Sequence, residues 1–300
     1  MELFDKSKKL AKEKNALILA HNYQIGEIQD IADLTGDSLE LSQKAAKNNA
    51  ELIVFCGVHF MAESASILSP QKKVIIPDPG AGCPMAEMVV PGDVLELKKK
   101  HPDALVVTYI NSTAAVKALS DVICTSSNAL KIVERVGSEK IIFLPDKNLG
   151  SYVQCFTDKK IILGDGFCPT HDTFSREELV RIKQKHPDAL VMVHPECRPE
   201  VVDLADMVLS TGNMVKFVEK TRVKKIIVGT ETGIIHKFKS ISPHIEYIPA
   251  SESFVCPNMK KINLDVLYRS LLEEETVVSV ESKIADKARI ALARMLELSY

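Results

Sequence analysis

The stretch HPDALVVTYINSTAAVKALSDVICTSSNALKIVERVGSEKII at residues 101–142 returns later in the chain as HPDALVMVHPECRPEVVDLADMVLSTGNMVKFVEKTRVKKII at residues 186–227. Aligned without a gap at an offset of 85 positions, the two segments share 16 of 42 residues, including the opening HPDALV and the closing KII. A fainter third copy, NALILAHNYQIGEIQDIADLTGDSLE, occupies residues 15–40, 88 positions before the second. Solenoid repeats run about 20–50 residues, whereas this period suits a small α/β unit. The sequence therefore predicts one domain present three times.

Short apolar runs recur at matching places in the three copies. Each copy opens with one, and two more follow after segments of helical period: ALILA (16–20), LIVFC (52–56) and KVIIP (73–77); ALVVT (104–108), IIFLP (141–145) and KIILG (160–164); ALVMV (189–193), IIVGT (226–230) and IEYIP (245–249). Continuous apolar runs are typical of strands buried on both faces of a parallel sheet. Because strands alternate with helices, each copy predicts a parallel sheet covered by helices.

Composition limits the function classes. The 300 residues are 46% hydrophobic and 26% charged, as in a soluble globular protein. The net charge is −2 and the basic residues are mixed with acidic ones, so no nucleic-acid surface is expected. No apolar run approaches the ~18 residues of a membrane span, and the N-terminal segment lacks the apolar core of a signal peptide. These features predict a cytoplasmic protein that binds neither nucleic acid nor membrane.

A shared aspartate (Asp33, Asp121 or Asp206) provides a reference point in each copy. Twelve residues before it stand His21, Tyr109 and His194, and ten residues before it stand Tyr23, Asn111 and Glu196. Both positions fall just past the carboxyl end of the first strand, the edge at which parallel α/β sheets bind ligands. Side chains two residues apart in an extended segment point the same way. Each copy should therefore direct one pair of polar side chains into a common site.

Hydroxyl side chains occupy a third equivalent position, five residues after the shared aspartate: Ser38, Ser126 and Thr211. Each precedes or opens a helix, where a lone Ser or Thr is most often an N-cap. Three of them at matched positions, each facing a polar strand end, favour a second interpretation. Free N–H groups at helix N-termini bind anions, so the three hydroxyls predict a pocket for a ligand with several carboxylates or phosphates.

The seven cysteines are an odd number in a reducing compartment and favour metal binding or reactive thiols over disulfides. Cys83, Cys168 and Cys256 are each followed by Pro, and they lie 50, 47 and 50 residues after the shared aspartate. One cysteine per copy predicts three thiolates near a pseudo-threefold axis, a set that can hold zinc or an iron–sulfur cluster. Zinc usually takes close CxxC pairs, which these long spacings do not supply. A 4Fe–4S cluster with three protein ligands would leave one iron open to act as a Lewis acid.

Ten motifs resemble those of quinolinate synthase, the A protein of de novo NAD biosynthesis: AHNYQ (20–24), DIADLTGDSLEL (30–41), GVHFMAE (57–63), YINST (109–113), VICTSSNA (122–129), PDKNLG (145–150), GFCPTH (166–171), HPEC (194–197), STGNM (210–214) and CPNMKK (256–261). The resemblance covers almost the whole chain. It implies an α/β fold of three pseudo-symmetric αβα three-layer domains, each with a short parallel sheet, around a central cluster and pocket. On this plan we expect domains at 1–83, 84–170 and 171–258, with C-terminal helices at 259–300 packed with the first.

The resemblance also implies a reaction. A transferase of this family condenses iminoaspartate (iminosuccinate) with dihydroxyacetone phosphate to give quinolinate, with loss of phosphate and two waters, a step of pyridine nucleotide biosynthesis. An L-aspartate oxidase or an aspartate dehydrogenase would be the functional partner that supplies iminoaspartate. The implied cofactor is an oxygen-sensitive 4Fe–4S cluster with three Cys ligands and one open iron.

The family's site residues transfer position by position onto this sequence. Its cluster ligands correspond to Cys83, Cys168 and Cys256. Its substrate-binding residues correspond to His21, Ser38, Tyr109, Asn111, Ser126, His194, Glu196 and Thr211, with Tyr23 in the same cavity. His171 also matches a family position, without a defined role, and the role of Cys197 stays open.

Acid–base chemistry is assigned to four of these residues: Glu196, Tyr109, Tyr23 and His194. Glu196 is the expected main acid/base, because a carboxylate near an anionic ligand and an apolar wall should have a raised pKa. Two other classes stay open from the residues alone. One is an iron–sulfur redox sensor or electron-transfer protein, and the other is a zinc-dependent hydrolase or binding module.

Overall fold

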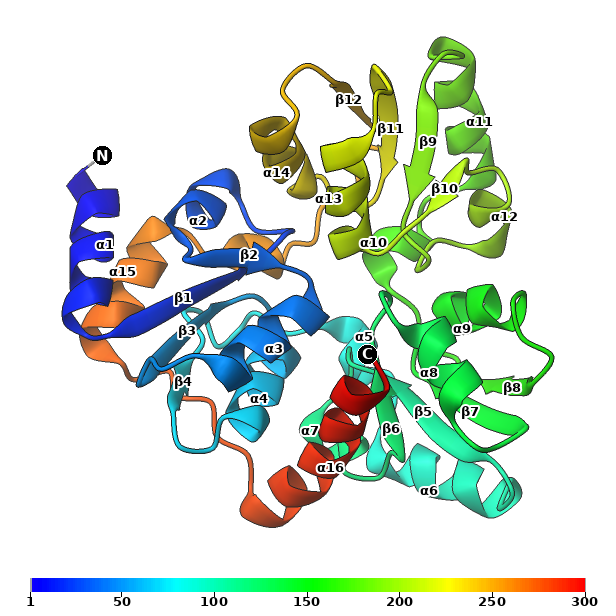
Figure 1. The fold of residues 1–300 in the computed structure, drawn as a ribbon, viewed down its shortest axis with the longest axis horizontal. Coiled ribbons are helices and arrows are strands. Elements are labelled where there is room, and N and C mark those ends of the chain that lie inside the picture. Colours follow the sequence, from blue (N-terminus) through cyan, green and yellow to red (C-terminus); the bar gives the residue numbers. More distant parts are fainter. Residues whose placement is uncertain (1, 300) are drawn as a thin grey trace.

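The computed structural model describes residues 2–299, which form three four-stranded parallel sheets flanked by helices (Figure 1). The first sheet consists of β1 (Ala16–His21), β2 (Leu34–Gly36), β3 (Leu52–Cys56) and β4 (Lys73–Ile75), in the order β2-β1-β3-β4. Its helices are α1 (Glu2–Glu13), α2 (Gly26–Ile31), α3 (Ser38–Lys47) and α4 (His59–Leu68). Strand β3 is buried along its full length, as its unbroken apolar run predicts.

The other two sheets repeat this strand order. The second consists of β5 (Leu105–Tyr109), β6 (Val122–Cys124), β7 (Lys140–Leu144) and β8 (Lys160–Leu163), with helices α5 (Pro84–Glu87), α6 (Pro91–Lys100), α7 (Ala114–Lys117), α8 (Ala129–Arg135) and α9 (Lys147–Gln154). The third consists of β9 (Leu190–Val193), β10 (Met207–Val208), β11 (Lys225–Gly229) and β12 (Glu246–Pro249), with helices α10 (Pro169–Asp172), α11 (Arg176–Lys185), α12 (Pro199–Val202), α13 (Thr211–Lys220) and α14 (Ile234–Ile241) and the 3₁₀ turn η1 (Met259–Lys261). The α/β fold of three parallel-sheet repeats, predicted from the sequence, is confirmed.

The shared aspartate has the same structural role in every sheet. Its carboxylate Oδ2 accepts a hydrogen bond from a backbone N–H of the neighbouring first strand: Asp33 from Ile18 (2.8 Å), Asp121 from Val106 (2.8 Å) and Asp206 from Val191 (2.7 Å). Its own backbone N–H donates to the carbonyl of that same residue at 2.9–3.0 Å. The aspartate therefore fixes the start of the second strand against the first.

The last two helices pack against the first two repeats. Helix α15 (Leu264–Glu273) packs against α1 of the first repeat, whereas α16 (Ser282–Leu298) contacts α4 of the first repeat and α7, α8 and β6 of the second (Figure 1). Between them, Val277 forms an antiparallel bridge with Ile75 at the end of β4. The domain boundaries at 83/84 and 170/171 stay predictions.

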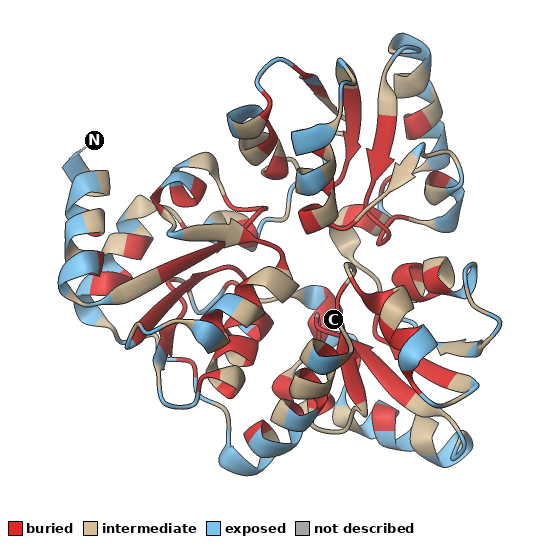
Figure 2. Cartoon of the chain, in the orientation of Figure 1, coloured by how far each residue is buried: buried red, intermediate tan, exposed pale blue. Residues whose placement is uncertain are grey.

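The strands of all three sheets point toward the middle of the molecule, and their buried residues surround it (Figures 1 and 2). The carboxyl ends of the parallel strands, where ligand sites form in such sheets, therefore face one another. Within residues 2–299, no helix combines the length and apolar character needed to cross a membrane.

Candidate active site

One cavity of about 160 Å³ lies where the carboxyl ends of the three sheets meet. Every residue that the sequence singled out for the site lines it: His21, Tyr23, Ser38, Cys83, Tyr109, Asn111, Ser126, Cys168, His194, Glu196, Thr211 and Cys256. The offsets from the shared aspartate thus lead to a single place in space. The individual roles of these residues stay predictions.

The two strand-end histidines are buried and oriented in the same way. The Nδ1 atom of His21 accepts a hydrogen bond from the backbone N–H of Tyr23 (3.2 Å), and Nδ1 of His194 accepts one from Glu196 (3.3 Å). With Nδ1 an acceptor, Nε2 carries the proton, and Nε2 of His194 lies 3.2 Å from Ser126 Oγ. Burial lowers the pKa of His21 to about 4 and that of His194 to about 3. Both are therefore neutral hydrogen-bond donors near pH 7.

Glu196 is held by groups from two repeats. Its Oε1 accepts a hydrogen bond of 2.6 Å from the Tyr109 hydroxyl, and its Oε2 lies 2.9 Å from Nδ1 of His171. Burial by itself would raise the pKa of Glu196, but the neighbouring His194 and His171 and the hydrogen bonds from His171 and Tyr109 outweigh it and lower the pKa. The expectation of a raised pKa for Glu196 is therefore wrong. The pKa is lowered because the carboxylate of Glu196 contacts hydrogen-bond donors and not an apolar wall.

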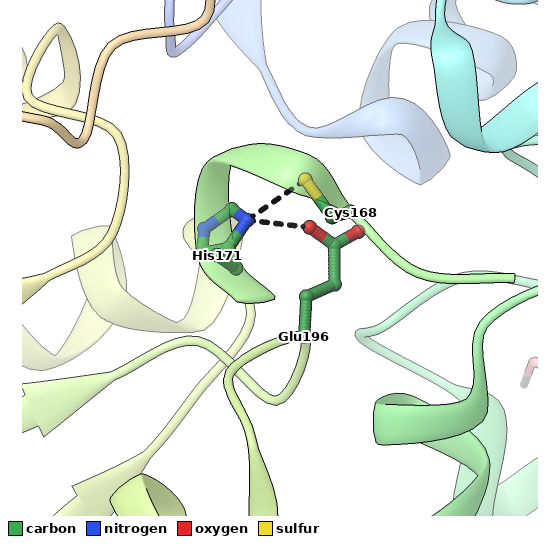
Figure 3. Close-up of side chains that lie close together, drawn as sticks. All are labelled: Cys168, His171 and Glu196. Carbon is green, nitrogen blue, oxygen red and sulfur yellow. Dashed lines mark hydrogen bonds and ion pairs between the residues drawn. The ribbon is translucent and has the colours of Figure 1, made fainter. Parts of the chain in front are cut away.

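His171, whose role the sequence left open, lies at the centre of this network (Figure 3). It is 1% exposed; its Nδ1 is 3.1 Å from Cys168 Sγ, and its Nε2 is 2.8 Å from Thr230 Oγ1. The Tyr23 hydroxyl lies 2.6 Å from the same threonine oxygen. A continuous hydrogen-bonded chain therefore runs from Tyr23 through Thr230, His171 and Glu196 to Tyr109. Such a chain can transfer protons across the cavity.

The two phenols at the ends of this chain are protonated near pH 7. Burial raises the pKa of Tyr23 and of Tyr109 well above the usual value, and the charge of Glu196 raises both further. The chain thus combines two proton-bearing phenols with a carboxylate between them, a set suited to general acid–base work.

The three cysteines occupy equivalent positions at the starts of short turns. Cys83 and Cys168 are the N-caps of α5 and α10, and Cys256 lies three residues before the first residue of η1. Burial raises the pKa of all three thiols, that of Cys83 to about 12. In each case the nearby backbone N–H three residues on, that of Ala86, His171 or Met259, opposes this effect on the pKa, although its hydrogen bond of 3.0–3.1 Å goes to the carbonyl of the cysteine.

These sulfurs are suited to metal coordination. A buried thiol becomes a thiolate when a cation compensates its charge, as a bound metal does. Cys83, Cys168 and Cys256 line the same cavity, and thiolates are the usual ligands of iron–sulfur clusters. A second donor set overlaps the first, because the ligand atoms of Cys168, His171 and Glu196 lie within 4.8 Å of one another (Figure 3). The centre therefore has the chemistry of a metal site.

The three hydroxyl positions are not helix caps. Asp37 and Ser210 cap α3 and α13 through their side chains, so Ser38 and Thr211 are the first helical residues and line the cavity. Ser127 Oγ donates to Asp37 Oδ2 at 2.5 Å and lies 3.0 Å from Ser210 Oγ. One residue from each repeat thus takes part in a contact directly beside the cavity.

Sequence reasoning missed a supporting group around Cys256. Glu231 is fully buried, and its Oε1 lies 2.8 Å from Lys260 Nζ and 3.2 Å from the backbone N of Cys256. Lys260 also donates to the Tyr23 carbonyl at 2.6 Å. A signal was present, because Thr230 and Glu231 are the polar residues at the end of the apolar run 226–230, at the ligand-binding edge of the third sheet.

Fold and site together define a class: an α/β enzyme with three parallel-sheet repeats and one buried cavity that combines acid–base groups with three thiols. Residues 5–297 match the sequence profile of the family described as Quinolinate synthetase A protein. The chain belongs to this family.

Curated relatives agree along almost the whole length. The chain is 53% identical over 291 residues to a quinolinate synthase of Caldicellulosiruptor saccharolyticus, covering 97% of this chain and 96% of the relative. It is 54% identical over 289 residues to one of Dehalococcoides mccartyi (96% of each) and 51% identical over 297 residues to one of Geotalea uraniireducens (99% and 98%). The resemblance stated from the motifs is confirmed.

Proposed function

We propose that this chain is a transferase that condenses iminoaspartate with dihydroxyacetone phosphate to quinolinate, releasing phosphate and two waters. The observation that supports this proposal is the lining of one cavity by all eight predicted substrate-binding residues and all three cysteines. Membership of the family and relatives named quinolinate synthase point to the same reaction. An L-aspartate oxidase or an aspartate dehydrogenase in the cytoplasm would supply the iminoaspartate.

Neutral donors hold the substrate carboxylates in this proposal. His21, His194, Ser38, Ser126 and Thr211 line the cavity, and among the described residues 2–299 no Lys or Arg does so. Ser38 and Thr211 are the first residues of α3 and α13, and because the side chains of Asp37 and Ser210 already cap these helices, the hydroxyls themselves are the proposed donors to the substrate. Donors of this kind bind a dianion and still release an aromatic diacid product.

Proton transfers are assigned to the chain from Tyr23 to Tyr109. Elimination of phosphate, isomerisation, ring closure and dehydration each move a proton, and a positioned group contributes typically about 10²–10⁴-fold to such a step. Glu196 is ionised at neutral pH and acts first as the base, with the Tyr109 hydroxyl and His171 as proton donors to it. Tyr23 and Thr230 extend the path to the opposite wall of the cavity.

The proposed cofactor is a 4Fe–4S cluster held by Cys83, Cys168 and Cys256. Three half-buried thiols that line one cavity fit a cluster of this kind. When bound, its open iron supplies Lewis acidity toward a departing hydroxyl.

Metal analysis of anaerobically purified protein tests the proposal. We expect about four iron and four sulfide per chain, a visible spectrum that shifts when quinolinate is added, and quinolinate formed from the two substrates. Cys256→Ser should lose the iron, whereas the matched control Cys155→Ser, at an exposed cysteine, should keep it. Iron that quinolinate does not perturb would point to a redox protein, and zinc in its place would point to a hydrolase or binding module.

A further inference from the structure

Two buried side chains occupy the same position in the first and second repeats. Gln29 and Lys117 each stand four residues before the shared aspartate, and each donates a hydrogen bond to the backbone carbonyl five residues earlier. The two acceptors are the carbonyls of Gln24 and Ser112. Each acceptor directly follows the second member of a strand-end pair, Tyr23 in the first repeat and Asn111 in the second. The repeat has thus placed equivalent donors beneath equivalent site loops.

Gln29 is 5% exposed, and carbonyl oxygens surround its amide nitrogen. Its Nε2 donates to Gln24 O at 2.7 Å, to Asn22 O at 3.2 Å and to Gly233 O at 2.8 Å. All three partners are carbonyl oxygens, which only accept hydrogen bonds. The NH₂ group of the amide must therefore point toward them, and this assigns the orientation of the Gln29 side chain. Gly233 belongs to the third repeat, so Gln29 both holds its own loop and joins it to a neighbouring repeat.

Lys117 is fully buried, and its ammonium donates to the carbonyl of Ser112. Its Nζ also lies 5.3 Å from the ring centre of Phe60, a residue of the first repeat that lines the cavity. Burial lowers the pKa of Lys117 to about 8, and the carboxylate of Glu63 opposes that change. Burying an ammonium group removes it from water, and this desolvation lowers the free energy of unfolding. A residue so unfavourable for stability, beside the site, indicates a functional reason for its presence.

The third repeat lacks a donor at this position, where it has Val202. Its strand-end loop is held from outside instead, because Nδ2 of Asn148, on α9 of the second repeat, donates to the carbonyl of Glu196 at 3.1 Å. Asn148 is itself buried. Each of the three site loops therefore has a buried side-chain donor on its backbone.

We propose that Gln29 and Lys117 are positioning residues that fix the loops carrying Tyr23 and Asn111, as Asn148 fixes the loop carrying Glu196. Neither Gln29 nor Lys117 lines the cavity, so both act through the backbone that they hold. A misplacement of about 1 Å in a residue that positions substrate can cost roughly 10²-fold in rate. The kinetic form of the proposal rests on the proposed function.

Replacing Lys117 by Met removes the charge and keeps most of the volume. We expect kcat/KM for quinolinate formation to fall about 10- to 100-fold. The midpoint of thermal unfolding should stay equal or rise, because a buried charge is exchanged for an apolar group. Lys99→Met, the same change at an exposed lysine of the same repeat, should leave both unchanged. Wild-type kinetics in Lys117→Met would overturn the proposal.

A double-mutant cycle separates positioning from a general loss of structure. If Lys117 acts through Asn111, the variant carrying both Lys117→Met and Asn111→Ala should be no slower than Asn111→Ala alone. Losses that multiply would contradict the proposal. Should Lys117→Met fail to fold, Gln29→Leu paired with Tyr23→Phe gives the same cycle in the first repeat, with the same two outcomes.

A crystal structure of Lys117→Met gives a readout that does not depend on activity. The backbone at 110–113 should be displaced relative to the wild-type protein, while the sheet beneath it keeps its place. An unmoved loop would overturn the proposal. If the wild-type chain forms no quinolinate, the proposed function fails, and the crystal structure alone then decides whether Lys117 positions the loop.

Discussion

The threefold repeat has different consequences at the shared aspartates of the sheets, called the rim below, and at the residues that line the cavity, called the centre. In the sheets, the shared aspartate makes the same hydrogen bond three times, with Oδ2–N distances of 2.7–2.8 Å. At the centre, the position ten residues earlier holds Tyr23, Asn111 and Glu196. One backbone plan thus supports three different functional side chains. Changes at the centre should therefore affect activity, and changes at the rim should affect stability.

The repeats also contribute unequally to the chemistry. His171, His194 and Glu196 all belong to the third repeat, and they form its buried ionisable group. The second repeat contributes a phenol and an amide, Tyr109 and Asn111, and the first contributes His21 and Tyr23. In the proposed mechanism, the third repeat therefore supplies the middle of the proton-transfer chain, and the first two repeats supply the phenols at its ends.

The largest effect should follow from Glu196→Gln. The substitution keeps the shape and removes the carboxylate that accepts from Tyr109 and His171, so kcat should fall about 10²–10⁴-fold. Quinolinate affinity should change much less, because in the proposed binding mode neutral donors other than Glu196 hold the carboxylates. Steady-state kinetics with anaerobic protein, together with calorimetric titration of quinolinate, measure both. Equal losses in turnover and binding would contradict the assignment, and the exposed control Glu200→Gln should lose neither.

Much of the fold could be predicted from the sequence, because local patterns carry it. The apolar runs marked the strands, and the offsets from Asp33, Asp121 and Asp206 brought the candidate site residues to one edge without any knowledge of distances. A short buried parallel strand needs an unbroken apolar run, and this requirement is visible in one dimension. The same pattern occurs three times, so the chain has three such edges, and in the structure they meet at one cavity.

The electrostatics of the site could not be read in the same way. The pKa of Glu196 is lowered first by His194, two residues earlier, and then by His171 and Tyr109, which come from other segments, so that the expected direction is reversed. The N-cap of α3 could not be assigned from the sequence, since Asp37 and Ser38 are both suitable caps. In the structure the cap is Asp37, whose side chain accepts from the first backbone N–H groups of the helix. Gln29 and Lys117 share an offset from the aspartate, but their burial could not be predicted, because a polar residue on a helix is ordinarily solvated.

A smaller effect, on stability alone, should follow from Asp206→Ala. The substitution removes the acceptor of the Val191 N–H, which lies on a buried strand, and should lower the free energy of unfolding by about 1 kcal/mol. The folded fraction should keep its kcat, since Asp206 is not one of the residues that line the cavity. Chemical denaturation with activity assays measures both quantities. Asp203→Ala, an exposed aspartate three residues away, is the matched control; a large loss of kcat in Asp206→Ala would erase the distinction between rim and centre.

The smallest effect should come from Glu274, at the outer end of α15. Its carboxylate pairs with Lys14 of the first repeat at 2.5 Å and with Lys73 of β4 at 2.7 Å, and these hydrogen bonds lower its pKa. A lowered pKa in the folded state means that the stabilisation is present above the unfolded pKa and is lost as the pH falls through the folded pKa. Glu274→Gln should therefore cost about 0.5 kcal/mol at pH 7, in the range of surface ion pairs, and nothing in strong acid. Chemical denaturation of the wild type and of Glu274→Gln across this pH range measures the difference in the free energy of unfolding, which should also shrink in high salt. A difference that persists in strong acid would show that packing, not charge, holds α15 against the first repeat.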